Sequence, residues 1–355
     1  MDFSNGKSLM GYLNTSSDFD LLNAEIQKAS QVFILADENT AVHCVTTLQP
    51  FIDCTYHLIT WKAGEPKKTM DAAMHVWAEL TKHEADRNVL LINVGGGVIG
   101  DIGGFAAGCY KRGIRYIQLP TSLLAMVDSS VGGKTGVDFN GFKNHIGLFN
   151  LPSHVFVHLP FLRTLPPREL LSGFAEVVKH YLIADKKAFL ELATPSFELK
   201  KVNWLASVQK SIAIKSKIVE EDYLETNARK SLNFGHTLGH AIESFYLDNE
   251  LNRFLHGEAI AVGMVAESYL SYHFGLISEK ELSVITSCLR KLFPLQPLPE
   301  TDFKSIISLV AQDKKNSAGQ NRFTLLKGIG NYSVNHFVEE YLMQEALHYF
   351  NLQIV

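Results

Sequence analysis

The chain has 355 residues, 46% of them apolar, so it is long enough to bury a core in each of two domains. Its 33 basic and 37 acidic residues give a net charge of −4, which argues against nucleic acid as a partner. Because no apolar stretch reaches the roughly 18 residues that span a bilayer, and the start lacks the pattern of a signal peptide, we expect a cytoplasmic protein with no membrane contact.

Short runs rich in apolar and β-branched residues recur through the first half of the chain. They predict strands at 31–37, 56–61, 88–94, 114–120 and 154–160, and the window 69–86 predicts a helix between two of them. Strands that alternate with helices are typical of a mostly parallel sheet covered on both faces. We therefore expect an α/β domain over residues 1–165.

A glycine-rich turn follows the predicted strand 88–94. Residues 95–100 read GGGVIG, which fits the GxGxxG pattern, and an Ala/Gly-rich helix comes next. Such glycines let the backbone approach a pyrophosphate, which the helix N-terminus then binds. The acidic residue that usually contacts the ribose about 20 residues later is missing. Asp37 and the turn at 64–68 are the candidates to replace it. A tight turn without a ligand is the alternative.

The segment 120–144 combines apolar, glycine and basic residues: PTSLLAMVDSSVGGKTGVDFNGFKN. Glycines beside a lysine let backbone amides and an ammonium group converge on a phosphate. The segment does not have Walker spacing, because the residue five before Gly133 is Asp128. We expect a loop that packs against a ligand, with a solvated surface loop as the alternative.

From residue 165 onward, apolar residues recur at helical spacing. The pattern predicts helices at 168–193, 204–222, 235–247, 257–274, 278–292 and 302–312. We therefore expect an all-α domain over residues 166–355.

Two of the predicted helices carry histidines in a pattern that metal sites use. His236 and His240 are four residues apart and share one helix face, and His256 opens the next helix. A catalytic zinc site uses three protein ligands and leaves one position open, so we expect a carboxylate that could serve as a ligand beside the histidines. Glu176, in SGFAEVVKHYL, is the natural candidate. Hydrogen-bonded structural histidines and an exposed helix glutamate are the alternatives.

The motifs together resemble the 3-dehydroquinate synthases, which are sugar phosphate cyclases of the shikimate pathway. The matching blocks occur in the same order: GEPKK, GGGVIGDIGGFAAGCYKRGI, PTSLLAMVDSSVGGKTGVDFNGFKN, TLPPRELLSGFAEVVKH, KSKIVEEDYLETNARKSLNFGHTLGHAIE followed by HGEAIAVGM, and DKKNSAGQNRF. The resemblance covers most of the chain. It implies a Rossmann-like NAD-binding N-terminal domain and a helical metal-binding C-terminal domain.

The resemblance also implies a role for each matching residue. The metal ligands would be Glu176, His236 and His256, with His240 beside them as a proton-transfer group. The NAD site would use Asp37, Glu65, Lys68, Gly96, Gly97, Asp101, Thr121, Ser122, Lys134 and Lys143. The substrate would be bound by Asp128, Lys134, Asn144, Lys179, Lys215, Arg229, Asn233 and one or both of Lys314 and Lys315. Arg112 would contact phosphate across a homodimer interface.

The reaction that the resemblance implies is a redox-neutral cyclisation. The substrate would be 3-deoxy-D-arabino-heptulosonate 7-phosphate, and the products would be 3-dehydroquinate and phosphate. NAD would be used and regenerated in each turnover, together with Zn²⁺ or Co²⁺, so the enzyme would be a carbon–oxygen lyase. The alternatives are another sugar phosphate cyclase, a metal- and NAD-dependent polyol dehydrogenase, or an inactive nucleotide-binding scaffold.

Overall fold

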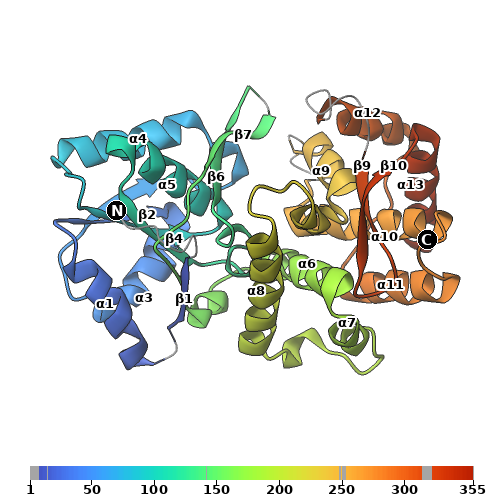
Figure 1. Ribbon diagram of the computed structural model, residues 1–355, viewed down its shortest axis with the longest axis horizontal. Coiled ribbons are helices and arrows are strands. Elements are labelled where there is room, and N and C mark those ends of the chain that lie inside the picture. Colours follow the sequence, from blue (N-terminus) through green and yellow to red (C-terminus); the bar gives the residue numbers. More distant parts are fainter. Residues whose placement is uncertain are drawn as a thin grey trace. The chain divides into compact units, whose positions relative to one another are not determined.

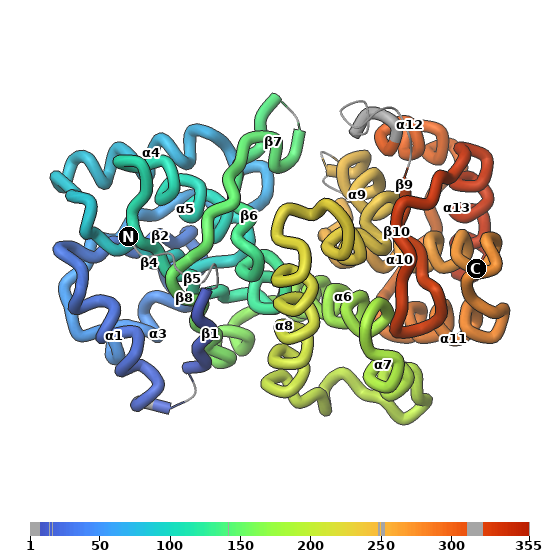
Figure 2. Tube along the Cα trace, viewed as in Figure 1, coloured from blue at the N-terminus to red at the C-terminus, as the bar shows by residue number. Residues whose placement is uncertain are grey.

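A computed structural model describes residues 8–13, 15–140, 142–247, 249, 253–313 and 322–354. Figure 1 shows its helices and strands, and Figure 2 follows the chain from the N-terminus to the C-terminus. The chain divides into two compact units, Met1–Leu170 and Leu171–Val355. This division falls in the first turns of α6, whereas the sequence analysis placed the boundary between residues 165 and 166.

The first unit holds strands β1 (Leu9–Tyr12), β2 (Val32–Asp37), β3 (His57–Trp61), β4 (Leu90–Gly95), β5 (Arg115–Pro120), β6 (Lys134–Phe139), β7 (Phe142–Phe149) and β8 (His154–Val157), and helices α1 (Phe19–Gln27), α2 (Glu38–Thr40), α3 (Thr46–Leu48), α4 (Met70–Lys82) and α5 (Gly97–Cys109). Helix α6 (Pro167–Ala184) leads into the second unit. That unit holds α7 (Lys186–Leu192), α8 (Trp204–Glu221), α9 (His236–Phe245), α10 (His256–His273), α11 (Glu279–Leu292), α12 (Phe303–Asp313), β9 (Arg322–Leu326), β10 (Tyr332–Phe337) and α13 (Glu340–Ile354).

A parallel sheet forms the centre of the first unit. Its six strands lie in the order β1-β8-β5-β4-β2-β3, and every neighbouring pair is parallel. The predicted strands β2, β3, β4, β5 and β8 are all present. Strand β8 stops at Val157, earlier than predicted, because Leu159-Pro160 begins a short 3-10 helix. Strand β4 is buried over its whole length, as expected of a parallel strand covered on both faces.

The two faces of this sheet bury alternate residues of each strand. Phe33, Leu35 and Leu91 point into a core that α4 and α5 complete. Figure 1 shows α1 and α3 on the opposite side of the sheet from these two helices. Side chains of a strand alternate between faces, so both layers of helices are anchored by the same strands. This arrangement confirms the predicted Rossmann-like class.

Helix α10 is the central element of the second unit. It is buried almost throughout its length, which is typical of a helix surrounded by others. Figure 1 shows α9, α11 and α13 around it. The predicted helix 168–193 is divided into α6 and α7 at Asp185, whose side chain caps α7 by accepting a hydrogen bond from the Ala188 N–H at 2.9 Å.

Two β-hairpins were not predicted. Strands β6 and β7 form an antiparallel pair where a loop was expected, and β9 pairs with β10 in the otherwise helical second unit. Among the described helices, none has an apolar stretch long enough to cross a membrane.

Candidate active site

In the first unit, the order in which the strands are added to the sheet reverses between β2 and β4. Strand β2 leads outward to β3, whereas β4 lies on its other side and leads to β5. Loops diverge at such a switch point and leave room for a ligand at the carboxyl ends of the strands. These ends carry Asp37 and the glycines after β4. The structure therefore brings Asp37, Gly96 and Gly97 to the same edge of the sheet.

Helix α5 begins directly after β4. Gly96 precedes its first turn, no side chain caps it, and both Gly96 and Gly97 are partly exposed. The first N–H groups of a helix have no partner within it, and the helix dipole adds positive charge there. This helix end can therefore bind an anion such as a pyrophosphate.

Asp37 has a structural contact of its own. Its Oδ1 accepts hydrogen bonds from the backbone N–H groups of Asn39 at 2.9 Å and Thr40 at 2.8 Å, and the Thr40 hydroxyl accepts one from the Asp37 N–H at 3.0 Å. This reciprocal pair of bonds is a capping box that ends β2 and starts α2. It fixes the carboxylate at the strand end.

Lys68 is the centre of a polar network in the first unit. The side chain is only 4% exposed, and its ammonium group donates to Asp101 Oδ2 at 2.5 Å and to the Asn144 side-chain oxygen. Burial opposes the charge, but the carboxylates of Asp101 and Glu65 outweigh it and raise the pKa of Lys68. Lys68 is therefore a charged side chain held inside the protein by carboxylates.

The β6–β7 hairpin joins this network. Asp138 Oδ1 accepts a hydrogen bond from the Asn144 N–H at 2.7 Å, and the Asp138 N–H donates to the Lys68 carbonyl at 2.8 Å. Lys143 Nζ lies 3.9 Å from Glu65 Oε1. Of the predicted residues, Glu65, Lys68, Asp101, Lys143 and Asn144 thus lie together. Asp138 was not predicted, because its partners come from distant parts of the chain.

The other predicted residues of the first unit lie on turns. The Thr121 N–H donates to the Gly95 carbonyl at 3.0 Å, so it joins the ends of β4 and β5, and the Ser122 hydroxyl accepts from the Ala125 N–H at 3.2 Å. Asp128 lies on a helical turn, Ala125–Ser129, and Lys134 is the exposed first residue of β6. Arg112 is exposed on a turn with a φ of 66°.

In the second unit, the N-termini of α9 and α10 lie close together. Gly235 precedes α9 with a φ of 78°, a conformation that favours glycine. A β-carbon on Gly263 of α10 would lie 2.0 Å from the Gly235 carbonyl oxygen, so only glycine permits this approach. The first residues of the two helices are His236 and His256, and their ring centroids are 5.5 Å apart.

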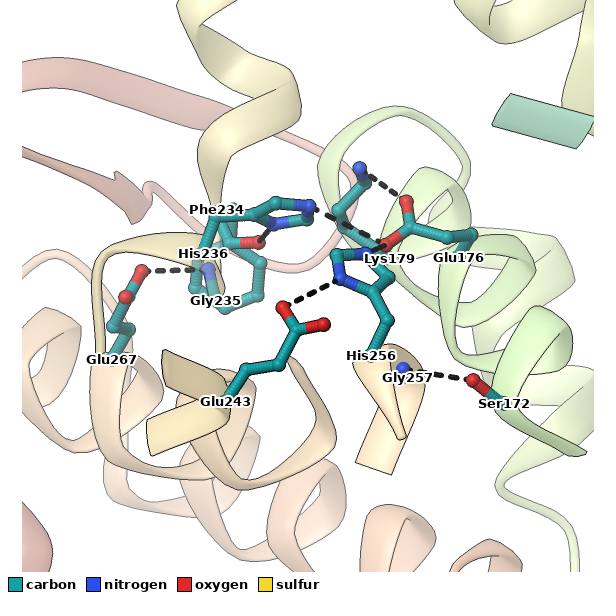
Figure 3. Close-up of polar contacts among 10 residues, drawn as sticks. All are labelled: Ser172, Glu176, Lys179, Phe234, Gly235, His236, Glu243, His256, Gly257 and Glu267. Carbon is teal, nitrogen blue, oxygen red and sulfur yellow. Dashed lines mark hydrogen bonds and ion pairs between the residues drawn. The ribbon is translucent and has the colours of Figure 1, made fainter. Parts of the chain in front are cut away.

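Both imidazoles face one carboxylate oxygen. Glu176 Oε1 lies 3.5 Å from His236 Nε2 and 3.4 Å from His256 Nε2. Figure 3 shows the two rings, from α9 and α10, pointing at this oxygen from α6. The other oxygen, Oε2, forms an ion pair with Lys179. The predicted ligands Glu176, His236 and His256 are thus brought together.

The other ring nitrogens show which tautomer each histidine has. His236 Nδ1 lies 3.1 Å from the Phe234 carbonyl oxygen, and His256 Nδ1 lies 3.3 Å from Glu243 Oε2. A carbonyl or a carboxylate can only accept, so Nδ1 carries the hydrogen in both rings. In each ring, Nε2 is therefore the nitrogen that faces Glu176 Oε1 and is placed to bind a metal ion.

These distances suit a bound metal ion. Two ligand atoms 2.0–2.1 Å from a tetrahedral zinc ion lie about 3.3–3.4 Å apart, close to the separations seen here. A charge-assisted hydrogen bond would be about 2.7–2.9 Å long. Moreover, Glu176 Oε1 is fully buried and accepts no hydrogen bond from the described part of the chain. Two imidazoles and a carboxylate form a donor set that accepts zinc or cobalt.

The electrostatics of this cluster keep Glu176 ionised and His236 neutral, which are the forms that bind a metal ion. Burial alone would raise the pKa of Glu176, but Lys179 and His236 outweigh it and hold that pKa well below its usual range. Burial and Lys179 lower the pKa of His236 well below its usual range. Burial opposes charge on His256, but Glu176 and Glu243 raise its pKa to about 10. A metal ion would compete with a proton for this position.

His240 lies one turn after His236 and is exposed. Its ring centroid is 4.9 Å from that of His236 and 5.6 Å from that of His256. One ligand atom of each of the three rings lies within 4.8 Å of those of the other two. The exposed position suits a group that exchanges protons with a ligand.

Three cations of the second unit are buried: Lys179, Lys215 and Arg229. The Arg229 guanidinium donates to the Tyr223 carbonyl at 2.6 Å, and the Asn233 amide donates to Glu225 Oε1 at 2.7 Å. Burying a cation costs free energy unless an anion or a hydrogen bond compensates. Burial also means that water screens the charges of these side chains only weakly. The predicted Lys314 and Lys315 lie outside the described residues.

Two family models together match residues 58–316 of this chain. A model described as 3-dehydroquinate synthase N-terminal matches residues 58–172, and one described as 3-dehydroquinate synthase C-terminal matches residues 173–316. The 3-dehydroquinate synthase of Parabacteroides distasonis is 39% identical over 327 residues, which cover 91% of this chain and 92% of that protein.

Two solved cyclases have the same fold. A 2-epi-5-epi-valiolone synthase from Streptomyces hygroscopicus, with NAD⁺ and Zn²⁺ bound, matches with a TM-score of 0.84 and 26% identity over 97% of this chain and 96% of that one. A 2-deoxy-scyllo-inosose synthase, in complex with carbaglucose-6-phosphate, NAD⁺ and Co²⁺, matches with a TM-score of 0.81 and 25% identity over 95% of each chain.

Proposed function

This chain belongs to the 3-dehydroquinate synthase family, and we propose that it converts 3-deoxy-D-arabino-heptulosonate 7-phosphate into 3-dehydroquinate and phosphate. By net reaction it is a carbon–oxygen lyase. The observation that carries the proposal is the convergence of two Nε2 atoms on one buried oxygen of Glu176, in a chain that matches both family models.

The two units divide the work in this proposal. The first binds NAD at the carboxyl ends of β2 and β4, where α5 begins and the Lys68 network lies. The second holds Zn²⁺ or Co²⁺ through Glu176, His236 and His256. When bound, NAD would supply reversible hydride transfer, and the metal ion would supply Lewis acidity at a substrate hydroxyl group.

The basic side chains bind an anionic substrate. The substrate carries a carboxylate and a phosphate, and buried cations neutralise such groups strongly because water does not screen them. Lys179, Lys215 and Arg229 supply these charges, with Asn233 as a hydrogen-bond donor. His240 is exposed beside the metal ligands and transfers protons. Asp128, Lys134, Asn144 and one or both of Lys314 and Lys315 complete the substrate site.

We further infer a cytoplasmic homodimer in which Arg112 contacts phosphate across the interface. The exposed position of Arg112 on its turn is compatible with this role. Another sugar phosphate cyclase is the alternative function. The 39% identity to a 3-dehydroquinate synthase, against 25% and 26% to the two other cyclases, favours the first assignment. A simple polyol dehydrogenase has no need for Lys215 and Arg229.

The test is a turnover assay with substoichiometric NAD⁺. The purified protein is incubated with the heptulosonate phosphate, Zn²⁺ and a small amount of NAD⁺, and inorganic phosphate and NADH absorbance are followed together. We expect phosphate in many-fold excess over NAD⁺ without accumulation of NADH, and loss of activity in Glu176→Gln or with a chelator. NADH that accumulates with a plain polyol would support the dehydrogenase. Retained NAD⁺ binding without phosphate release would refute the substrate assignment.

A further inference from the structure

Glu243 is a buried carboxylate beside one of the proposed metal ligands. It is 7% exposed, and its Oε2 lies 3.3 Å from His256 Nδ1. Figure 3 shows this contact on the side of the imidazole that faces away from Glu176. Since the contact joins α9 to α10, it is a tertiary contact and not part of a helix.

Helix geometry explains why Glu243 reaches this place. It follows His236 by seven residues and His240 by three, so all three side chains lie on one face of α9. That face is directed at the N-terminus of α10, where His256 is the first residue. The next N–H, of Gly257, donates to the Ser172 hydroxyl at 2.9 Å. The backbone after His256 is thus hydrogen-bonded to α6, and the imidazole ring of His256 is hydrogen-bonded to α9.

The two proposed histidine ligands differ in what holds them. His236 donates Nδ1–H to a neutral backbone carbonyl of its own segment, at 3.1 Å. His256 donates to a charged carboxylate on another helix. A carboxylate acceptor both orients a ligating imidazole and makes its free nitrogen more basic. Loss of Glu243 would therefore affect His256 and leave the His236 contact unchanged.

We propose that Glu243 is a positioning residue for the metal site: by accepting the Nδ1–H of His256, it fixes the tautomer and the ring orientation that present Nε2 toward Glu176. This inference rests on the proposed function, since it assumes that a divalent metal ion binds there. It extends the site to a residue that neither the spacing of the histidines nor the family resemblance identified.

Substitutions of Glu243 separate its charge from its hydrogen bond. Glu243→Gln keeps an acceptor oxygen but loses the charge, whereas Glu243→Ala loses both. Groups that orient a metal ligand are typically worth 10–100-fold in metal affinity. We expect Glu243→Ala to weaken Zn²⁺ binding by about 10–100-fold, and Glu243→Gln by less, roughly tenfold or below.

A matched control is available on the same helix end. Glu258 caps α10 by accepting a hydrogen bond from the Leu255 N–H at 2.8 Å, two residues from His256. Glu258→Gln weakens this cap without removing the carboxylate that contacts the His256 ring. The Glu258→Gln variant therefore shows how a less stable N-terminus of α10 affects metal affinity when the Glu243 contact is intact.

The experiment measures Zn²⁺ affinity by competition with a chromogenic chelator for the full-length wild type, Glu243→Gln, Glu243→Ala, Glu258→Gln and Glu176→Gln. Unfolding of each metal-free variant is measured in parallel. Co²⁺ is then added as a spectroscopic probe, because its visible absorption depends on ligand geometry. We expect weaker Zn²⁺ binding and an altered Co²⁺ spectrum in the Glu243 variants, but a wild-type spectrum in Glu258→Gln.

Two negative outcomes have different meanings. If wild type binds Zn²⁺ in a manner that requires Glu176, and both Glu243 variants bind it equally well, the role of Glu243 is disproved and the proposed function stands. If wild type binds neither ion, the metal site itself is wrong. Should Glu243→Ala fail to fold, Glu243→Leu takes its place, because it also removes the acceptor oxygen but keeps the side-chain volume. An unchanged affinity and spectrum in that variant overturn the proposal.

Discussion

Glu267, a fully buried residue of α10, accepts a hydrogen bond from the Gly235 N–H at 2.6 Å. Its second oxygen accepts one from the Leu238 N–H at 3.1 Å. These donors flank the start of α9, where the N–H groups have no partner within the helix and the dipole favours an anion. A carboxylate from α10 thus caps the helix that begins with His236.

Glu267→Ala is therefore expected to destabilise the protein. It leaves two buried N–H groups without their acceptor, and hydrogen bonds to charged groups contribute about 1.5–3 kcal/mol each. We expect a loss of about 3–6 kcal/mol in the free energy of unfolding, measured with urea. The control Glu279→Ala removes an exposed carboxylate from α11 and should change stability by about 0.5 kcal/mol or less. Equal stability of the two variants would contradict the capping role.

Gly103 is predicted to tolerate no side chain while Asn93 is present. A β-carbon on Gly103 of α5 would lie 1.9 Å from Asn93 Oδ1 of β4, and Asn93 is 1% exposed. Overpacking of this kind costs about 1–3 kcal/mol, so Gly103→Ala should be destabilised by that amount. In the double variant with Asn93→Ala the clash is relieved. The loss there should be smaller than the sum of the two single losses, and additive losses would show that the contact does not limit packing.

The sheet was predictable because its strands are buried. Strands β2 and β4 are nearly continuous apolar runs, which is what burial on both faces of a parallel strand produces. The β6–β7 hairpin gives no such signal. Most of β7 is exposed, and Gly136 faces Gly147 across the pair, so the sequence there resembles a loop.

The candidate site was predictable only where spacing within a helix revealed it. His236 and His240 are four residues apart, and His256 begins the next helical run. Glu243 and Glu267 gave no comparable signal, although Glu243 continues the face of His236. Their partners are a ring nitrogen and backbone N–H groups on another helix. Such contacts depend on how α9 packs on α10, and the spacing of residues within one helix does not predict that packing.

Lys68 offers a test of the proposed NAD site. Its ammonium group donates to Asp101 of α5 and to Asn144 of β7. Lys68→Met keeps much of the apolar stem but removes the charge, and a lost charged hydrogen bond of about 1.5–3 kcal/mol corresponds to roughly 10–100-fold in affinity. We expect NAD⁺ affinity, measured by calorimetry, to fall by that factor. Lys67→Met, at the exposed neighbouring position, is the control. Unchanged binding in both variants would remove Lys68 from the cofactor site.

Asp222 predicts how stability depends on pH near Arg229. Its carboxylate accepts hydrogen bonds from the backbone N–H groups of Thr226 at 2.9 Å, Asn227 at 2.6 Å and Arg229 at 3.1 Å. Burial opposes ionisation, but these donors outweigh it and lower the pKa of Asp222 from 3.8 to about 2. The carboxylate therefore orders the loop that carries Arg229 as long as it is ionised.

Because the pKa of Asp222 is lower in the folded state than in the unfolded state, the stabilisation is complete above about pH 4 and disappears as the pH falls through about 2. Asp222→Asn keeps the shape and one acceptor oxygen but cannot ionise. We expect wild type to be more stable than this variant near neutral pH, and the difference in urea midpoint to shrink steadily between about pH 4 and about pH 2. A difference that stays constant over this range would mean that ionisation of Asp222 does not contribute to it, and would contradict the prediction.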